Sequence, residues 1–235
     1  MNLSEIMSEI EALGNERTKK RYESQGAKEP LFGVPSGALK PVAKKLMNNQ
    51  PLAEELYATG NYDAMYLAGM IADPKMIKPA DFDRWIAKAY FYMISDFIVS
   101  VTLAETEFAE EVADKFIASK DELVMSAGWS CYEWLIGSRK DSEFNRDKLL
   151  SMLETVEKSI HSQPNRTRYA MNGFVVAVGV SFIPLHEEAM QVAERIGEVS
   201  ISFGKKESSV LNAYESIKRA TDKGRLGFKR KNVRC

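Results

Sequence analysis

The 235-residue sequence has few of the residues that mark several common protein classes. Its 14 glycines, 8 prolines and 2 cysteines exclude collagen-like, low-complexity and disulfide-framework proteins. Cys131 and Cys235 lie far apart and outside any paired motif, which favours a reducing compartment and argues against a thiolate metal site. The two histidines, His161 and His186, are isolated, so catalysis by a Ser-His or Cys-His pair is not expected.

Long apolar runs are also missing. No run approaches the roughly 20 residues that a membrane-spanning helix requires. The longest extends from about Phe174 to Ile183 and is interrupted by Gly179 and Ser181. The first residues lack the basic and then apolar pattern of an export signal. We therefore predict a cytoplasmic protein without a membrane partner.

The net charge of −1 hides an uneven distribution of charge along the chain. Residues 218–234 contain one acid, Asp222, and eight basic residues, which are Lys218, Arg219, Lys223, Arg225, Lys229, Arg230, Lys231 and Arg234. The rest of the chain holds 24 basic and 32 acidic residues. A basic tail on an acidic body indicates either contact with a polyanion or a frayed, solvated terminus, and the sequence leaves both open.

Helical periodicity is present in nearly every segment, and strand-like alternation over a useful length is not. Two sets of residues follow the spacing i, i+3, i+4, i+7 and i+8 of one helix face: Leu39, Val42, Ala43, Leu46 and Met47, and Phe82, Trp85, Ile86, Ala89 and Tyr90. Pro51 and Pro79 suit first helical turns, and Asp121 or Ser36 suits an N-cap. The sequence therefore predicts an all-α fold.

The predicted helix starts are evenly spaced. Helical pairs open near Ser36, Pro79, Asp121 and Pro164, at intervals of 43, 42 and 43 residues, which is typical of HEAT-type repeats. Stacked pairs would form an α-α superhelix, or solenoid, with a concave inner face. We predict one domain over 1–235, with a helical cap at 3–30, repeats at 36–78, 79–120, 121–163 and 164–205, and the basic tail at 218–235. The last repeat would end in a turn at Gly204. The alternative is a compact helical bundle.

An aromatic-rich segment surrounds Trp129 and Trp134 and also contains Cys131, Tyr132, Leu135 and Ile136. Such helices pack in a core more often than they form a binding platform. Gly128 would permit a neighbouring helix to approach closely, which also favours core packing.

Asp96 is the one charged residue of a largely apolar stretch at 89–104. Burying a carboxylate in such surroundings is costly unless it is paired or its function compensates. Asp96 is therefore the first candidate functional residue. The alternative is a capping role, in which Ser95 or Asp96 begins a helix that runs to Ala104.

A second candidate group lies in residues 165–173. Arg168 and Asn172 are four residues apart and therefore adjacent on a helix, while Arg166 lies at its N-terminal end, where backbone amides favour an anion. This pattern suits phosphate, although a solvated basic face has the same composition. Arg139 and Lys140 form another basic cluster that could line the same groove of a solenoid.

Several stretches resemble the AlkD-type DNA alkylation repair family. The first is LFGVP at 31–35, followed by Leu39, Ala43 and Lys44, and the second is LAEELYATGN at 52–61, followed by Asp63 and Ala64. The segment SAGWS at 126–130 and residues 165–172 resemble a branch of the same family. The resemblance thus covers most of the chain.

The resemblance implies an α-helical solenoid of HEAT-like repeats that binds DNA in its concave groove. Active members are monofunctional glycosylases that remove positively charged N3- and N7-alkylpurines without a metal or an organic cofactor. Such an enzyme mainly stabilises the developing oxocarbenium charge of the sugar and orients a water. The family uses a Trp-Trp-Asp-x-x-x-Asp-like stretch for this, and here Asp96 matches its final carboxylate while Tyr92 stands where a Trp is expected.

Two positions depart from the pattern of active members. Ser126 stands where a groove Arg is expected, and the place of a further Trp falls on Gly173 or Phe174. Loss of a cation and an indole face would weaken phosphate positioning and cation stabilisation, although Arg166 or Arg168 could compensate. Members that lack part of the set bind DNA without detectable base excision.

The sequence therefore predicts a DNA alkylation repair protein that binds alkylated or distorted double-stranded DNA as a monomer. It is a candidate alkylpurine DNA glycosylase without a cofactor or metal, with Asp96 and Tyr92 as catalytic residues. The predicted DNA-binding residues are Arg139, Lys140, Arg166, Arg168, Asn172 and Phe174. The alternatives are a non-catalytic binder of damaged or branched DNA and a HEAT-type protein-interaction scaffold.

Overall fold

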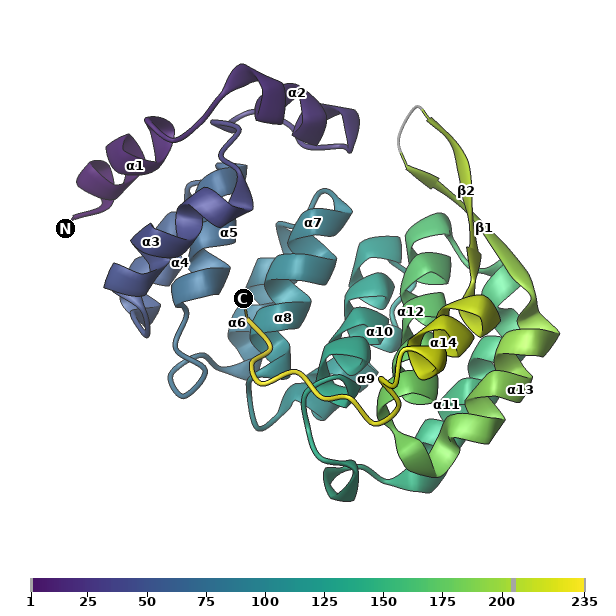
Figure 1. Cartoon of the computed structure of the whole chain (residues 1–235). Coiled ribbons are helices and arrows are strands. Elements are labelled where there is room, and N and C mark those ends of the chain that lie inside the picture. Colours follow the sequence, from purple (N-terminus) through teal and green to yellow (C-terminus); the bar gives the residue numbers. More distant parts are fainter. Residues whose placement is uncertain (1, 204–205, 235) are drawn as a thin grey trace. The chain divides into compact units, whose positions relative to one another are not determined.

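The structure is a computed structural model that describes residues 2–203 and 206–234 (Figure 1). Within these residues the regular secondary structure is helical apart from one β-hairpin. It divides into two compact units. Unit 1 ends at Phe108 and also includes Arg234, and unit 2 covers 109–233.

Unit 1 is built from short helices in chain order, shown in purple to blue in Figure 1. They are α1 (Leu3–Glu11), α2 (Glu16–Ser24), α3 (Ser36–Leu46), α4 (Gln50–Ala58), α5 (Tyr62–Ile71), α6 (Pro79–Ala87), α7 (Tyr92–Ile94), the π-helical turn η1 (Ser95–Val99) and α8 (Ser100–Ala104). The predicted helix face on α3 is confirmed, because Leu39, Val42 and Ala43 are buried. Met47 lies beyond the end of that helix and is exposed.

Unit 2 contains longer helices and the hairpin. Its elements are α9 (Ala109–Ile117), α10 (Glu122–Ile136), η2 (Asp141–Glu143), α11 (Arg146–Ser159), η3 (Ile160–Ser162), α12 (Asn165–Ser181), η4 (Ile183–Leu185), α13 (His186–Ile196), β1 (Glu198–Phe203), β2 (Lys206–Asn212) and α14 (Ala213–Asp222). The core prediction for the aromatic segment is confirmed, since Trp129, Tyr132 and Leu135 of α10 are buried. Trp134 is half-buried.

The helix starts explain why these segments are helical. Side chains of Asn or Asp accept a hydrogen bond from a first-turn backbone N–H at seven starts, those that follow Asn2, Asn15, Asn49, Asn61, Asp121, Asn145 and Asn212. The predicted Asp121 cap is therefore confirmed, and Pro51 and Pro79 lie in first turns. The suggested Ser36 cap is wrong, because Ser36 is the first residue of α3 and no side chain caps that helix.

The four evenly spaced positions are all helix starts, but the helices between them are not uniform pairs. Residues 36–78 hold three helices, α3, α4 and α5. Asn48 has a positive φ of 59°, which is not a helical conformation, and it separates α3 from α4. Domain and repeat boundaries stay predictions.

The antiparallel pair β1 and β2 was not expected from the sequence. Val199 and Ile201 are buried while Ser200 and Ser202 are exposed, an alternation too short to separate from a helix end. The predicted turn residue Gly204 lies outside the described residues.

A buried carboxylate organises the start of unit 1. Asp63 Oδ2 accepts hydrogen bonds from the backbone N–H groups of Phe32 (2.6 Å) and Gly33 (3.0 Å), and Oδ1 accepts one from Val34 (2.9 Å). Burial raises the pKa of the Asp63 carboxyl, although these three hydrogen bonds lower it. Gly33 has a φ of +75°, and a Cβ there would lie 2.6 Å from the backbone nitrogen of Lys19, so the position requires glycine.

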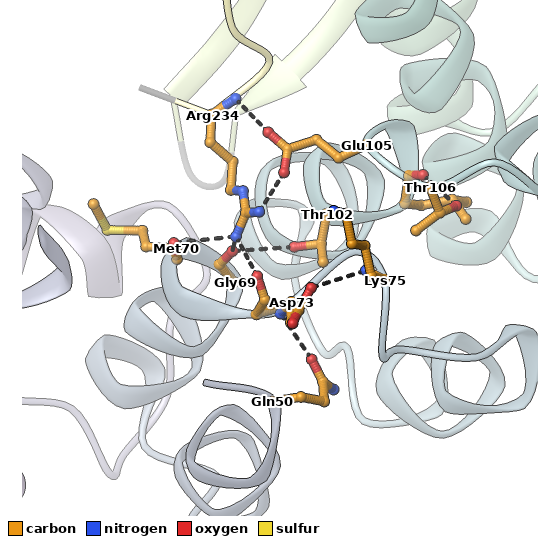
Figure 2. Close-up of polar contacts among 11 residues, drawn as sticks. Gln50, Gly69, Met70, Asp73, Lys75, Thr102, Glu105, Thr106 and Arg234 are labelled. Carbon is orange, nitrogen blue, oxygen red and sulfur yellow. Dashed lines mark hydrogen bonds and ion pairs between the residues drawn. The ribbon is translucent and has the colours of Figure 1, made fainter. Parts of the chain in front are cut away.

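Arg234 closes the C-terminal end of α5 (Figure 2). Its Nη1 donates to the carbonyl oxygens of Gly69 (3.1 Å), Met70 (3.1 Å) and Ala72 (2.8 Å), and its Nη2 pairs with the Glu105 carboxylate. A cation is favourable at this position because the last carbonyls of a helix have no intrahelical partners. Arg234 of the basic tail is therefore packed against protein, and the frayed alternative is wrong for this residue.

We expect Arg234→Ala to lower the free energy of unfolding of unit 1 by about 1 to 2 kcal/mol, because Glu105 and three carbonyls lose a charged partner. Urea unfolding followed by circular dichroism measures this change. Lys75→Ala, a nearby change of an exposed cation, is the control and should have little effect. Equal midpoints for the two variants would contradict the capping role.

No single helix in the described part of the chain is long and apolar enough to cross a bilayer. The segments Asn165–Ser181 and Ile183–Ile196 would qualify together by length and composition, but they are bent by 113°.

Candidate nucleic-acid interface

Asp96 lies in the π-helical turn η1, inside a continuous helical segment formed by α7, η1 and α8. Its side chain is 1% exposed, and Oδ1 accepts a hydrogen bond from the Ser95 hydroxyl (2.8 Å). The Ser95 carbonyl accepts hydrogen bonds from both the backbone N–H and the hydroxyl of Ser100, the latter at 2.7 Å. The capping alternative is wrong, because the helix begins after Phe91, one turn before Asp96.

Tyr92 is half-buried at the start of the same segment. Its ring packs edge to face on Phe91, with centroids 5.8 Å apart, and on Phe97, with centroids 6.3 Å apart. Tyr92 and Asp96 are therefore held by one short helical segment, with the tyrosine ring more accessible than the carboxylate.

The candidate residues of unit 2 lie on or beside α10 and α12, whose N-terminal ends meet. The Arg166 backbone N–H donates to Glu122 Oε1 (2.6 Å), and the Thr167 hydroxyl donates to the Glu122 carbonyl (3.4 Å). The first-turn amide for which the sequence suggested a phosphate thus binds a carboxylate of the protein itself. A phosphate at that amide would have to displace Glu122.

The polar residues of α12 differ in exposure. Arg166 is buried, and its guanidinium lies over the Tyr169 ring, 4.4 Å from the centroid. Arg168 is half-buried and its Nε is enclosed without a hydrogen-bond partner. Asn172, one turn further, is buried, and its Oδ1 also has no hydrogen-bond partner. Arg168 and Asn172 thus lie one turn apart on α12, and each has a buried polar atom without a hydrogen-bond partner.

Arg139 and Lys140 lie beyond the other end of α10. Arg139 is half-buried and Lys140 is exposed. Because α10 has 15 residues and a helix rises 1.5 Å per residue, these two are roughly 20 Å from the Arg166 end. The predicted DNA-binding residues thus form two groups rather than one cluster.

The positions that depart from the expected pattern all face protein. The Ser126 hydroxyl is buried and donates to the Arg166 carbonyl (3.3 Å). Phe174 is 0% exposed and packs edge to face on Trp129, so it contributes to the core of unit 2. A Cβ at Gly173 would lie 2.4 Å from Glu133 Oε2, so a larger side chain there would have to displace the Glu133 carboxylate.

The basic strap, residues 223–231, is a candidate surface whose position the sequence did not predict. The sequence shows that this part of the tail is basic, but where it lies on the protein depends on contacts with residues far away in the sequence. Arg230 lies over the Trp134 ring, 4.4 Å from the centroid, and its backbone N–H donates to the Gly137 carbonyl (2.7 Å). Lys229 Nζ donates to the Ile136 carbonyl (2.8 Å) and pairs with Asp141 (2.8 Å).

Other chemistry finds little support in unit 2. Burial raises the pKa of the Cys131 thiol, which keeps it protonated and unsuited to nucleophilic attack. Among the described residues, no three side chains of His, Cys, Asp or Glu are grouped so that they could hold a metal ion.

Comparison with known proteins places these features in context. A family model described as DNA alkylation repair enzyme matches residues 6–196. The uncharacterized proteins Lin0241 of Listeria innocua and Lmo0209 of Listeria monocytogenes are each 28% identical over 228 residues, which cover 95% of this chain and 99% of theirs.

A solved structure is more similar. It is described as "a new family of proteins related to the HEAT-like repeat DNA glycosylases with affinity for branched DNA structures". It is 60% identical, with a TM-score of 0.96 over 100% of both chains. The predicted all-α fold of HEAT-like repeats is confirmed.

Proposed function

The chain belongs to the DNA alkylation repair enzyme family, and from this premise we propose that it binds branched DNA without excising bases. The observation that carries the proposal is the similarity, 60% identical along the full length, to a protein described as having affinity for branched DNA. The glycosylase activity that the resemblance implies is then a property of other family members.

The composition of the site supports binding without excision. A glycosylase must stabilise positive charge that develops on a sugar, so its carboxylate and aromatic faces have to reach the nucleotide. Asp96 is 1% exposed, and its carboxylate accepts a hydrogen bond from the Ser95 hydroxyl. Gly173 leaves space that the Glu133 carboxylate fills, so an anion stands where an indole is expected.

Exposed cations support contact with phosphates. Lys140 is exposed and Arg168 is half-buried on unit 2, and the basic strap adds five cations without an acid. The remaining chain is acidic, so attraction to DNA would be concentrated on these surfaces. Contacts of this kind position DNA without selecting a sequence, and they weaken as salt displaces the protein.

One experiment tests both parts of the proposal. The full-length protein is titrated into a four-way junction, a three-way junction and a linear duplex of matched sequence at 50 mM and 200 mM salt, and base release is followed on methylated duplex. We expect tighter binding to both junctions, at least about tenfold weaker binding at the higher salt, and no released 7-methylguanine. Equal affinity for junctions and duplex, or base release, would contradict the proposal. Binding to no DNA would favour the interaction scaffold.

Base excision remains a second candidate because Asp96 is retained in a π-helical turn, an irregularity that often marks functional sites. If the wild-type protein releases 7-methylguanine, Asp96→Asn should abolish release and leave duplex affinity nearly unchanged. Equal release by this variant would remove Asp96 from the mechanism.

A further inference from the structure

We propose that Phe228, displayed by the basic strap, stacks on a base that is left unstacked at the branch point of DNA. This inference rests on the proposed function and adds to it the surface that distinguishes branched from linear DNA. The strap is the segment that follows α14, in yellow in Figure 1.

Hydrogen bonds from both sides hold the strap against unit 2. Upstream of Phe228, the backbone N–H of Gly227 donates to the Val180 carbonyl near the end of α12 (2.7 Å). Downstream, Arg230 and Lys229 are bound to the carbonyls at the end of α10. The Phe228 N–H itself donates to the Arg225 carbonyl (3.0 Å) and closes a turn. The backbone at Phe228 is therefore held in place before any ligand binds, which reduces the entropic cost of binding.

Phe228 is exposed although it is a large apolar residue. Its exposed fraction is 56%. The other aromatic side chains whose burial the structure describes are buried or half-buried. Two neighbouring apolar residues are also exposed, Leu226 at 41% and Ile183 at 56%. Ile183 lies beside the strap at the residue before Phe228, because a Cβ at Gly227 would lie 2.8 Å from Ile183 Cδ1. An exposed apolar cluster of this kind commonly marks a binding surface.

Charge identifies the partner as nucleic acid. Residues 223–231 themselves include no acid and five cations, of which four are exposed: Lys223, Arg225, Arg230 and Lys231. Lys229 is used internally, in its pair with Asp141. An exposed aromatic face on a segment rich in exposed cations is suited to bind bases and phosphates together. A protein partner would have to be strongly acidic to fit it.

The geometry of DNA explains why this surface favours a branch. In a regular duplex every base is stacked on both faces, so an aromatic side chain can insert only by separating two base pairs, at a cost of a few kcal/mol. At a branch point the stack is interrupted, and a base face is available without that cost. The cations contact phosphates of either DNA, whereas Phe228 contributes only at the branch.

Phe228→Ala tests the inference, because an exposed side chain can be removed without unfolding the protein. We expect affinity for a four-way junction to fall by about 5- to 100-fold and affinity for a linear duplex of matched sequence to change less than twofold. Phe228→Trp should retain the preference for the junction. A 2-aminopurine placed at the branch should lose fluorescence on binding the wild type and not on binding Phe228→Ala.

Met76→Ala is the matched control, because Met76 is a similarly exposed apolar residue of unit 1 and should leave both affinities unchanged. If the wild type prefers the junction and Phe228→Ala keeps that preference, the inference is wrong and the proposed function stands. An equal loss on both DNAs would also overturn it. If the wild type has no preference, the proposed function fails first.

The alternative partner for this surface is a second copy of the chain. Analytical ultracentrifugation of the wild type and of Phe228→Ala decides the point. A wild type that sediments as a dimer and a variant that sediments as a monomer would overturn the inference, and two monomers would support it.

Discussion

Replacement of Asp63 by alanine should lower the free energy of unfolding of unit 1 by at least about 3 kcal/mol, because three buried backbone N–H groups lose their acceptor and each costs roughly 1 to 3 kcal/mol. The unfolding midpoint should fall by roughly 10 °C or more. Thermal and urea unfolding followed by circular dichroism measure both quantities.

The same carboxylate explains why the segment at 31–35 and Asp63 carry the family resemblance together. They are one hydrogen-bonded unit, in which the acid from the start of α5 fixes the chain that precedes α3. Their role is therefore in folding, and DNA contact need not involve them.

Glu55→Ala serves as the control, because Glu55 is an exposed acid of α4 and its removal should change the free energy of unfolding by less than about 0.5 kcal/mol. An Asp63→Ala protein as stable as Glu55→Ala would show that water or another group takes over the three donors.

Gly128→Ala is expected to destabilise unit 2 by about 2 to 3 kcal/mol. A Cβ at this position would lie 2.7 Å from the Ala113 carbonyl oxygen and 2.8 Å from the backbone nitrogen of Ile117, so α9 must move away from α10. Backbone cannot yield as a flexible side chain can, and the displacement would disturb the core around Trp129. The sequence-based prediction that Gly128 permits close packing is confirmed by this contact.

Gly37→Ala is the matched control, because no atom lies within 4 Å of the added Cβ on α3. Here alanine should stabilise the helix by roughly 0.5 to 1 kcal/mol. Urea unfolding of both variants measures the contrast. If Gly128→Ala unfolds at the wild-type midpoint, the α9–α10 contact can open without cost.

Features that depend on local chemistry could be predicted. The helix face with Leu39, Val42 and Ala43 is buried, Asp121 caps α10, and the aromatic segment of α10 packs in the core. The hairpin could not be predicted, because the alternation of buried and exposed residues around Val199 and Ile201 is only a few residues long. Its pairing also depends on the return strand, β2.

The site divides in the same way. Sequence identified Asp96, Arg168 and Asn172 as unusual residues, but only the fold revealed that Asp96 is enclosed and that Glu122 occupies the amide of Arg166. These outcomes depend on partners that the spacing within one helix does not specify.

By itself the sequence determined the helical class, the Asp121 cap, the family resemblance and the uneven charge, since each follows from residues within a few positions of one another or from composition. Tertiary structure alone decided which polar groups are enclosed and where the basic strap lies. Those properties arise from contacts between residues dozens of positions apart, such as Asp63 with Phe32 and Arg230 with Gly137.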